Sequence, residues 1–160
     1  DALNNNAINK ICKLKGINPD KTNLSIICDG ISMAAEYARF DNRQFKVLKS
    51  NLPGPFTFIL PSSSSLPKVF KGRKTVGIRV PKNNVVVALV RSLGNPILST
   101  TISFKDDDYA VNPELIAETY AGSAAYLLDD GDGGLIPSTV VDMTSGELEI
   151  VREGKGELIY

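Results

Sequence analysis

The sequence of 160 residues contains no histidine. This absence excludes serine–histidine and cysteine–histidine nucleophile pairs, and it excludes metal sites built from imidazole groups. Any chemistry must therefore depend on lysine, on carboxylates, on groups that a substrate brings, or on the positioning of reactants.

Cysteine is scarce, and long apolar runs are absent. The two cysteines, Cys12 and Cys28, both lie in segments with an apolar pattern. This placement favours buried free thiols in a reducing compartment over a disulfide or a ligand pair. No apolar run approaches the ~20 residues of a membrane helix, and residues 1–16 carry no apolar signal region. We therefore expect a cytoplasmic protein without a membrane partner.

The net charge is zero, but the charges are unevenly distributed along the chain. Residues 1–82 hold 14 Lys and Arg against 5 Asp and Glu, whereas residues 83–160 hold 4 against 13. One interpretation is a dipolar domain whose charges are all solvated. The other is a basic face for phosphates that the first half of the chain builds.

Helix and strand patterns alternate through most of the chain, and strand patterns gather at its end. With 42% hydrophobic residues, this predicts one α/β (α+β) domain over residues 1–160, in which helices pack on a mixed sheet. On the third helix, Phe45 and Leu48 are expected to face the core. The spacing predicts helices over 4–14, 31–38, 41–49, 85–93 and 112–120, and strands over 23–28, 56–60, 75–81, 97–99, 124–128, 139–143 and 148–153.

Hydroxyl side chains cluster directly after the expected strand 97–99. Open α/β sheets place ligands at the carboxyl ends of strands, and small hydroxyl residues there can offer donors to a phosphate or carboxylate. The alternative is a serine-rich loop whose hydroxyls are solvated. The cluster consists of Ser99, Thr100, Thr101 and Ser103.

Arg79 is the second candidate, in the expected strand 75–81. In an alternating strand, Gly77 and Arg79 share one face, and Val76 and Ile78 share the other. An arginine beside a glycine leaves room for an anion and suits bidentate binding of a carboxylate or phosphate. The alternative is a surface arginine on an exposed face of the sheet.

Two further segments carry weaker signals. Ser138 and Thr139 precede a late strand and follow the stretch "DDGDGG", which lacks the closing glutamate of a calcium loop and is expected to be a solvated turn. Lys10, Lys13 and Lys15 project from the first helix. They could meet phosphate, although lysines also occur at helix ends because of the helix dipole.

Five phrases then occur in an order that resembles the YrdC family of threonylcarbamoyl-AMP synthases. They are "LPGPFTFIL", "TVGIRVP", "PILST", "PSTVVD" and "VREG". The stretch "YARFDN" and the ending "VREGKG" are most similar to the YciO branch of that family. The likeness covers roughly residues 7–156.

The resemblance implies a twisted open mixed sheet with flanking helices and a concave basic surface that binds nucleotide and RNA. The synthases make threonylcarbamoyl-AMP from threonine, bicarbonate and ATP, and the product serves tRNA modification. The implied partners are RNA (tRNA or double-stranded RNA), ATP or AMP, and L-threonine. Mg²⁺ would accompany ATP, with no tightly bound cofactor and no resident metal.

The resemblance also assigns residues. Arg79, Ser138 and Lys15 match substrate-binding positions, and Lys15 corresponds to the lysine of the family's "K-x-R" motif. Arg152 matches an arginine near the nucleotide. The implied nucleotide loop is Ser99, Thr100, Thr101 and Ser103, and the implied RNA-binding lysines are Lys10, Lys13 and Lys15.

The sequence departs from the family at three places. Ile17 replaces the arginine of "K-x-R", and Thr101 and Ser103 stand where the "S-x-N" pair is expected. Losing one charge-assisted hydrogen bond costs about 1.5–3 kcal/mol, which is roughly ten- to a hundredfold in rate. The family's opening "P-T-D-T-Y" strand has no counterpart before Asp1, so we expect the domain to lack its N-terminal strand.

Three functions stay open on the sequence alone. The departures favour a nucleotide- and RNA-binding member with little synthase activity. An active synthase with a variant nucleotide loop is the second reading, and a non-catalytic interaction domain is the third.

Overall fold

The computed structural model describes residues 1–102 and 107–160 and, within these, all side chains except those of 107 and 108. Its strands are β1 (Ser25–Ile27), β2 (Phe56–Pro61), β3 (Thr75–Arg79), β4 (Ile97–Ser99), β5 (Thr139–Asp142) and β6 (Glu149–Arg152). Its helices are α1 (Asn5–Lys15), α2 (Ile31–Tyr37), α3 (Asn42–Asn51), α4 (Asn84–Leu93), α5 (Asp107–Val111) and α6 (Pro113–Thr119), with a 3₁₀ turn η1 (Lys68–Lys71).

The chain divides into two compact units. The main unit comprises residues 1–100 and 138–160, and the helical unit comprises residues 101–137. The main unit contains every strand of the sheet, and the helical unit contains α5 and α6. The main unit is therefore discontinuous in sequence, because the helical unit is inserted between β4 and β5.

The six strands form one open mixed sheet in the order β4-β1-β3-β2-β5-β6. The pairs β1–β3 and β2–β5 are parallel, and the other neighbours are antiparallel. Phe58 lies opposite Ile78 on β3, and Ile78 lies opposite Ile26 on β1. All three are fully buried, so they form a continuous apolar row across the middle of one sheet face.

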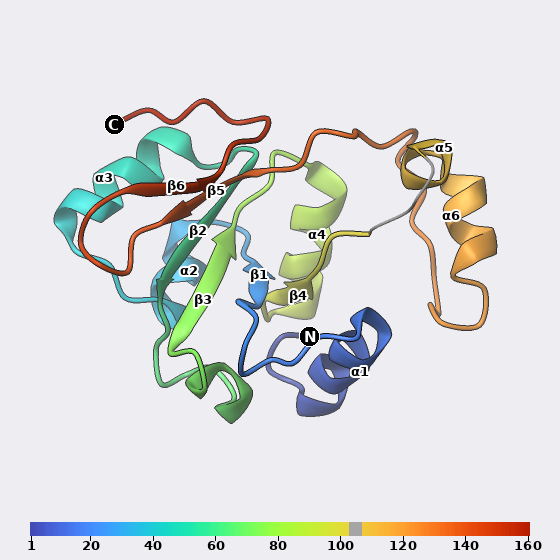
Figure 1. Cartoon of the computed structure of the whole chain (residues 1–160), viewed down its shortest axis with the longest axis horizontal. Coiled ribbons are helices and arrows are strands. Elements are labelled where there is room, and N and C mark those ends of the chain that lie inside the picture. The colour runs from blue at the N-terminus through green and yellow to red at the C-terminus, as the bar shows by residue number, and fades with distance from the viewer. Residues whose placement is uncertain (103–106) are drawn as a thin grey trace. The chain divides into compact units, whose positions relative to one another are not determined.

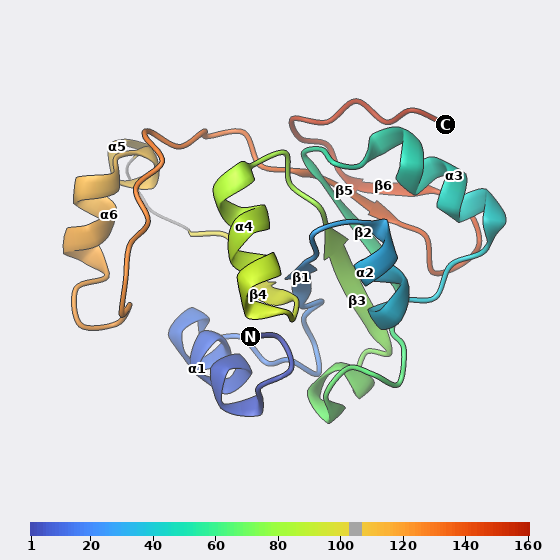
Figure 2. The same cartoon turned by 180° about the vertical axis from the view of Figure 1, so that it is seen from behind.

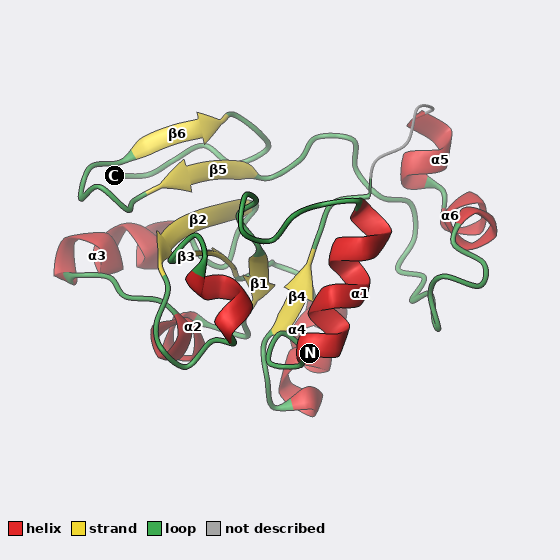
Figure 3. Cartoon of the chain, turned by 60° about the horizontal axis from the view of Figure 1, so that its bottom comes forward, coloured by secondary structure: helices red, strands yellow, loops and turns green. Residues whose placement is uncertain are grey.

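Helices cover both faces of this sheet. The helices α2, α3 and α4 lie on one face, and α1 lies on the other (Figures 1 and 2). The same layering appears with the bottom of the molecule turned forward (Figure 3). Leu48 of α3 and Ala34 of α2 are fully buried in one cluster with Phe58 and Ile78. The prediction of a mixed α/β sheet with flanking helices is confirmed.

Asparagine and aspartate side chains fix where the helices begin. Asn4 accepts from the backbone N–H of Asn6 and Ala7, and Asn83 accepts from Val86. These bonds satisfy N–H groups that have no partner within the helix. Asp41 and Gln44 form a reciprocal capping box at the start of α3. The caps explain why these helix boundaries fall within about two residues of those expected from the sequence.

The C-terminal tail is tied back to the main unit. The Thr139 hydroxyl donates to the carbonyl of Gly156 at 2.6 Å and accepts from the N–H groups of Gly154 and Gly156. Further along, the side-chain amide of Asn51 pairs with both the N–H and the carbonyl of Ile159. The tail therefore connects β5 to α3.

Two sequence-based expectations are wrong. Phe45 is 40% exposed, because the buried side of α3 is formed by Val47, Leu48 and Asn51. Residues 124–128 form no strand, and Tyr126 is 90% exposed. A strand needs a neighbour for its backbone groups, and every described strand lies in the main unit.

The pattern did not reveal η1 or α5, which are two short elements. Among the described helices, none has the length and apolar composition that crossing a bilayer requires. The single-domain interpretation, like the concave basic surface, stays a prediction.

Candidate functional site

One face of the sheet carries polar groups among apolar ones, since Ile59 lies opposite Gly77 and Ile27 lies opposite Arg79. On β3 the side chains of Val76 and Ile78 are fully buried in the core, so alternation directs Gly77 and Arg79 to the opposite face. Gly77 pairs with Ser25 of β1, and Ser25 pairs with Ser99 of β4. Partners directly opposite each other share a face. This polar face is the one that α1 flanks, since α2, α3 and α4 lie over the core face (Figure 2).

Gly77 leaves a gap in the middle of the polar face. A Cβ at this position would lie 2.5 Å from the hydroxyl oxygen of Ser25 and 3.1 Å from a methyl carbon of Thr57. The first separation is shorter than real Cβ contacts, so a larger residue would displace its neighbours. The glycine lets side chains from β1 and β2 approach each other across β3.

Arg152 and Ser138 are in direct contact at one end of this face. The Arg152 guanidinium donates to the carbonyl oxygen of Ser138 at 2.7 and 3.2 Å and to its hydroxyl at 3.3 Å. The Ser138 hydroxyl lies 3.1 Å from that of Thr57 on β2. Ser138 is thus linked to the polar face through Thr57, whose side chain also borders Gly77.

Arg79 completes this group. Desolvation by burial lowers the pKa of Arg79, and the positive charge of Arg152 lowers it further. Among the residues that the structure describes, neither guanidinium has a carboxylate partner. Two nearby cations without an anion, one of them partly buried, are the arrangement that a bound phosphate or carboxylate would stabilise.

The hydroxyl cluster is divided between the two units. Ser99 lies on the polar face, and its hydroxyl oxygen is buried without a hydrogen-bond partner in the described part of the chain. Thr100 is exposed at the end of the main unit, whereas Thr101 begins the helical unit and makes an interaction of its own. Ser103 lies outside the described residues.

The three lysines of α1 differ in exposure. Lys10 and Lys13 are exposed, whereas Lys15 is partly buried and already interacts with another group. Ile17, which follows the C-cap Gly16, packs against the core. An apolar side chain in the core cannot supply the charge of the arginine expected there.

Sequence reasoning missed Ser25 and Thr57, because neither stands in a recognisable motif and only strand pairing brings them beside Gly77.

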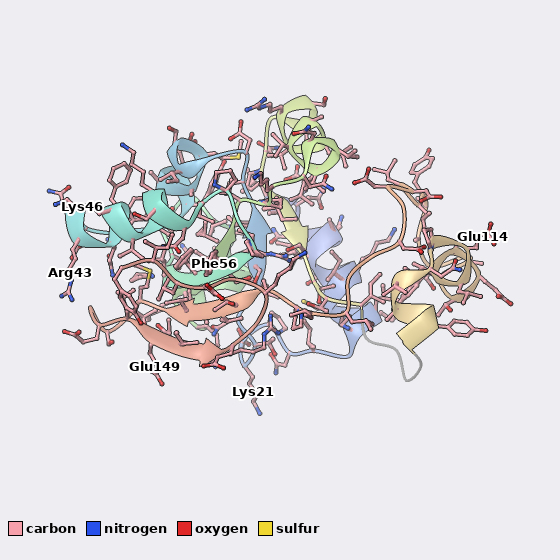
Figure 4. The ribbon with its side chains drawn as sticks, turned by 90° about the horizontal axis from the view of Figure 1, so that it is seen from above. Lys21, Arg43, Lys46, Phe56, Glu114 and Glu149 are labelled. Atoms are coloured by element: carbon pink, nitrogen blue, oxygen red, sulfur yellow. The ribbon has the colours of Figure 1, made fainter. Side chains whose placement is uncertain are left out.

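Sequence reasoning also missed a group of basic residues around Arg73 and Lys21. The Arg73 guanidinium donates to the carbonyl of Lys21 at 3.0 Å and to the side chain of Asn23 at 3.1 Å, and Lys21 projects outward (Figure 4). Four basic residues within seven positions were the available signal: Lys68, Lys71, Arg73 and Lys74.

Comparison with known proteins gives this geometry a context. The family model Sua5_yciO_yrdC, described as "Telomere recombination", matches residues 1–154. The Escherichia coli K12 protein YciO, described as uncharacterized, is 34% identical over 96% of this chain and 75% of its own length. The crystal structure of E. coli YciO superposes with a TM-score of 0.89 at 33% identity, covering 98% of this chain and 77% of that one.

A second relative has a described activity. The threonylcarbamoyl-AMP synthase of Pyrococcus abyssi is 25% identical over 96% of this chain, which spans 46% of that protein. A structure of P. abyssi Sua5 complexed with L-threonine has a TM-score of 0.83 at 28% identity, again over 96% of this chain and 46% of that one. The chain therefore belongs to the Sua5/YciO/YrdC family and is related to threonylcarbamoyl-AMP synthase.

Proposed function

We propose that the polar face binds a nucleotide and a small carboxylate and that the chain also binds RNA, with little or no synthase activity. Arg79, Ser138 and Lys15 would hold the carboxylate of L-threonine or a related compound. The phosphates of ATP or AMP, with Mg²⁺ accompanying ATP, would meet Arg152, Ser99 and Thr100. The family resemblance also assigns Thr101 and Ser103 to nucleotide binding. No tightly bound cofactor is part of this proposal.

The observation that carries the proposal is the group formed by Arg79, Arg152 and Ser138. The Arg152 guanidinium contacts the carbonyl of Ser138 at 2.7 and 3.2 Å, its positive charge helps to lower the pKa of Arg79, and no described carboxylate neutralises either guanidinium. Arginine forks match phosphate and carboxylate oxygens in bidentate geometry. An anion at this point would offset both the mutual repulsion and the desolvation of Arg79.

The position of Ile17 argues against full catalysis. Its side chain packs against the core, so this residue cannot supply a charged donor to a triphosphate. One lost charge-assisted hydrogen bond is worth about 1.5–3 kcal/mol. Synthase activity would suffer more than binding, because the transition state needs every such contact.

An active synthase is the second candidate, and the relation to the P. abyssi enzyme favours it. Release of pyrophosphate from ATP, measured with L-threonine and bicarbonate, separates the two. We expect ATP and AMP to bind in calorimetry while pyrophosphate release stays at the background rate. Rapid release that needs all three substrates would establish the synthase instead.

The site assignment is tested with Arg79→Lys and Arg79→Ala, with Arg43→Ala on the exposed surface of α3 as control. Lysine keeps the charge but loses the planar fork. We expect both Arg79 variants to melt near the parent temperature and to bind ATP or L-threonine about tenfold or more weakly. If Arg79→Ala instead melts several degrees lower with ligand affinity unchanged, the residue is structural.

RNA binding would depend on Lys10 and Lys13, whose side chains are exposed on α1. Each phosphate contact contributes about 0.9 to the slope of log affinity against log salt for a duplex. The double variant Lys10→Gln/Lys13→Gln should therefore lower the slope by about 1 to 2, whereas Arg43→Gln/Lys46→Gln on α3 should not. Absence of RNA binding at low salt would favour the interaction-domain reading.

A cytoplasmic location is part of the same proposal. Cys12 and Cys28 are both free and buried, and unpaired thiols persist in reducing compartments. Localisation of a tagged full-length protein by fractionation would test it.

A further inference from the structure

A pocket of about 680 Å³ lies beside the core face of the main unit, and neither Arg79 nor Arg152 lines it. It is lined by α2 and the loop before it, by α3 and the segment after it, by the segment between β3 and α4, and by one side of α4. These helices share one face of the sheet (Figure 2). The volume falls within the roughly 300–1,000 Å³ that is typical of small-molecule sites.

One wall of the pocket is aromatic. The rings of Phe40 and Phe45 are stacked with centroids 6.5 Å apart and an angle of 15° between their planes. Both residues line the pocket together with Ile31, Val80 and Val87. Phe45 is 40% exposed although the periodicity of α3 suggested a core position. Its exposed ring is therefore available to an apolar molecule in the pocket.

The lining also contains three cationic side chains. Lys49, Lys82 and Arg91 line the pocket, and Asp29 is the one carboxylate among its lining residues. Asp29 pairs with Arg91 at 3.5 Å, which leaves the two lysines without a carboxylate partner among the described residues. The N-terminus of the ten-residue helix α4 also borders the pocket and adds positive potential.

We propose that this pocket binds an organic anion with a planar apolar body. An apolar wall alone would suit a neutral hydrophobic molecule, and two lysines alone would suit inorganic phosphate. The two features in one pocket favour an aromatic carboxylate, phosphate or sulfonate. Its ring would lie against Phe40 and Phe45, and its acid group would face Lys49 and Lys82. The pocket shares no residue with the Arg79 site, so it is a second site.

A fluorescence titration with 1-anilinonaphthalene-8-sulfonate, an aromatic sulfonate, tests the proposal on the folded chain. We expect one saturable site per chain. Phe45→Ala, Lys49→Gln and Lys82→Gln should each weaken binding about three- to tenfold, as expected for the loss of an apolar or charged contact. Lys46→Gln serves as control, because this lysine lies on the same helix but does not line the pocket.

Two measurements make the outcome decisive. N-phenyl-1-naphthylamine has the same rings without the sulfonate, so we expect it to bind weakly and to be insensitive to Lys49→Gln. Equal binding of both probes, or sulfonate binding that none of the three variants weakens, would overturn the proposal. Thermal melting of each variant checks that it is folded. Lys49 and Lys82 are exposed, so we expect Lys49→Gln and Lys82→Gln to fold like the parent chain.

Displacement of the sulfonate in an Arg79→Ala background identifies the natural ligand class. Displacement by AMP would indicate a nucleotide, and displacement by an aromatic carboxylate such as indole-3-acetate would indicate a carboxylate. Failure of both at millimolar concentration would overturn the proposed class. Because Arg79 is absent in this background, the result does not depend on the proposed nucleotide site.

Discussion

At the scale of single residues, the absence of a side chain at Gly77 shapes the polar face. Ser25 and Thr57 reach toward each other across the place where a side chain would stand. The strand pattern predicted that Gly77 and Arg79 share a face, because the alternation in a strand has a period of two. It could not reveal that Arg152 contacts Ser138, because that contact depends on the pairing of β5 with β6 and on an irregularity between Val140 and Val141.

Gly77→Ala is therefore expected to destabilise the fold. The new Cβ would meet the Ser25 hydroxyl and force it to move, at a cost of about 1–3 kcal/mol. Thermal melting should show a decrease of several degrees, and adding Ser25→Ala should recover part of it. Gly134→Ala is the matched control, because this residue is exposed in a loop and a Cβ there meets nothing within 4 Å. Equal melting temperatures for Gly77→Ala and the parent would contradict the crowding.

At the same scale, the thiol of Cys28 makes the free energy of unfolding depend on pH. Burial raises the pKa of its thiol to about 12, with smaller contributions from Asp29 and Glu36. The folded state therefore keeps the proton above pH 9, where the unfolded chain releases it. Stability from this group is present below the thiol's ordinary pKa and is lost as the pH rises from about 9 toward 12.

Chemical denaturation between pH 7 and 11 would measure this loss. We expect Cys28→Ala to be less stable at pH 7 because of the lost packing, but to have a flatter pH profile above 9. A profile parallel to that of the parent would show that another group causes the alkaline loss.

At the scale of elements, α3 shows what a sequence pattern can and cannot predict. Asp41 was expected to cap this helix, and it does so with Gln44, whose amide also donates to the carbonyl of Met143 at 2.8 Å. The pattern failed for Phe45, because the rotational position of a helix depends on the surface against which it packs. A helix cap depends on residues that are close together in the sequence, so the sequence pattern predicts it. The residues against which a helix packs are distant in the sequence, so the pattern does not predict them.

Asp41→Ala should accordingly lower the free energy of unfolding by about 1 kcal/mol, because the N–H of Gln44 loses its acceptor. Asp41→Asn should retain most of the stability, and Lys46→Ala on the exposed surface of α3 should have little effect. Urea denaturation of the three variants would measure these differences. A loss for Asp41→Asn as large as that for Asp41→Ala would contradict the cap, because asparagine is as good an N-cap residue as aspartate.

At the scale of the whole molecule, the family and the mixed sheet could be predicted because five phrases stand in order along most of the chain. The division of the candidate site between the two units could not be predicted from the sequence. The hydroxyl cluster looked continuous in sequence, but Ser99 belongs to the main unit and Thr101 to the helical unit. The pocket beside Phe40 and Phe45 has no recognisable motif in the sequence, because it forms where three helices that are separate in sequence meet over a sheet.

The insertion of the helical unit has a consequence for the integrity of the chain. Strand β5 lies between β2 and β6, and Thr139 and Asn51 hold the residues that follow. Backbone continuity through residues 101–137 is therefore not what keeps the last segment in place. If a specific protease cuts a recognition sequence inserted between Asp132 and Gly133, the two pieces should co-elute in gel filtration and separate only in denaturant. Elution of residues 133–160 alone would contradict this, whereas co-elution would make the protein a natural candidate for reassembly from two separately produced halves.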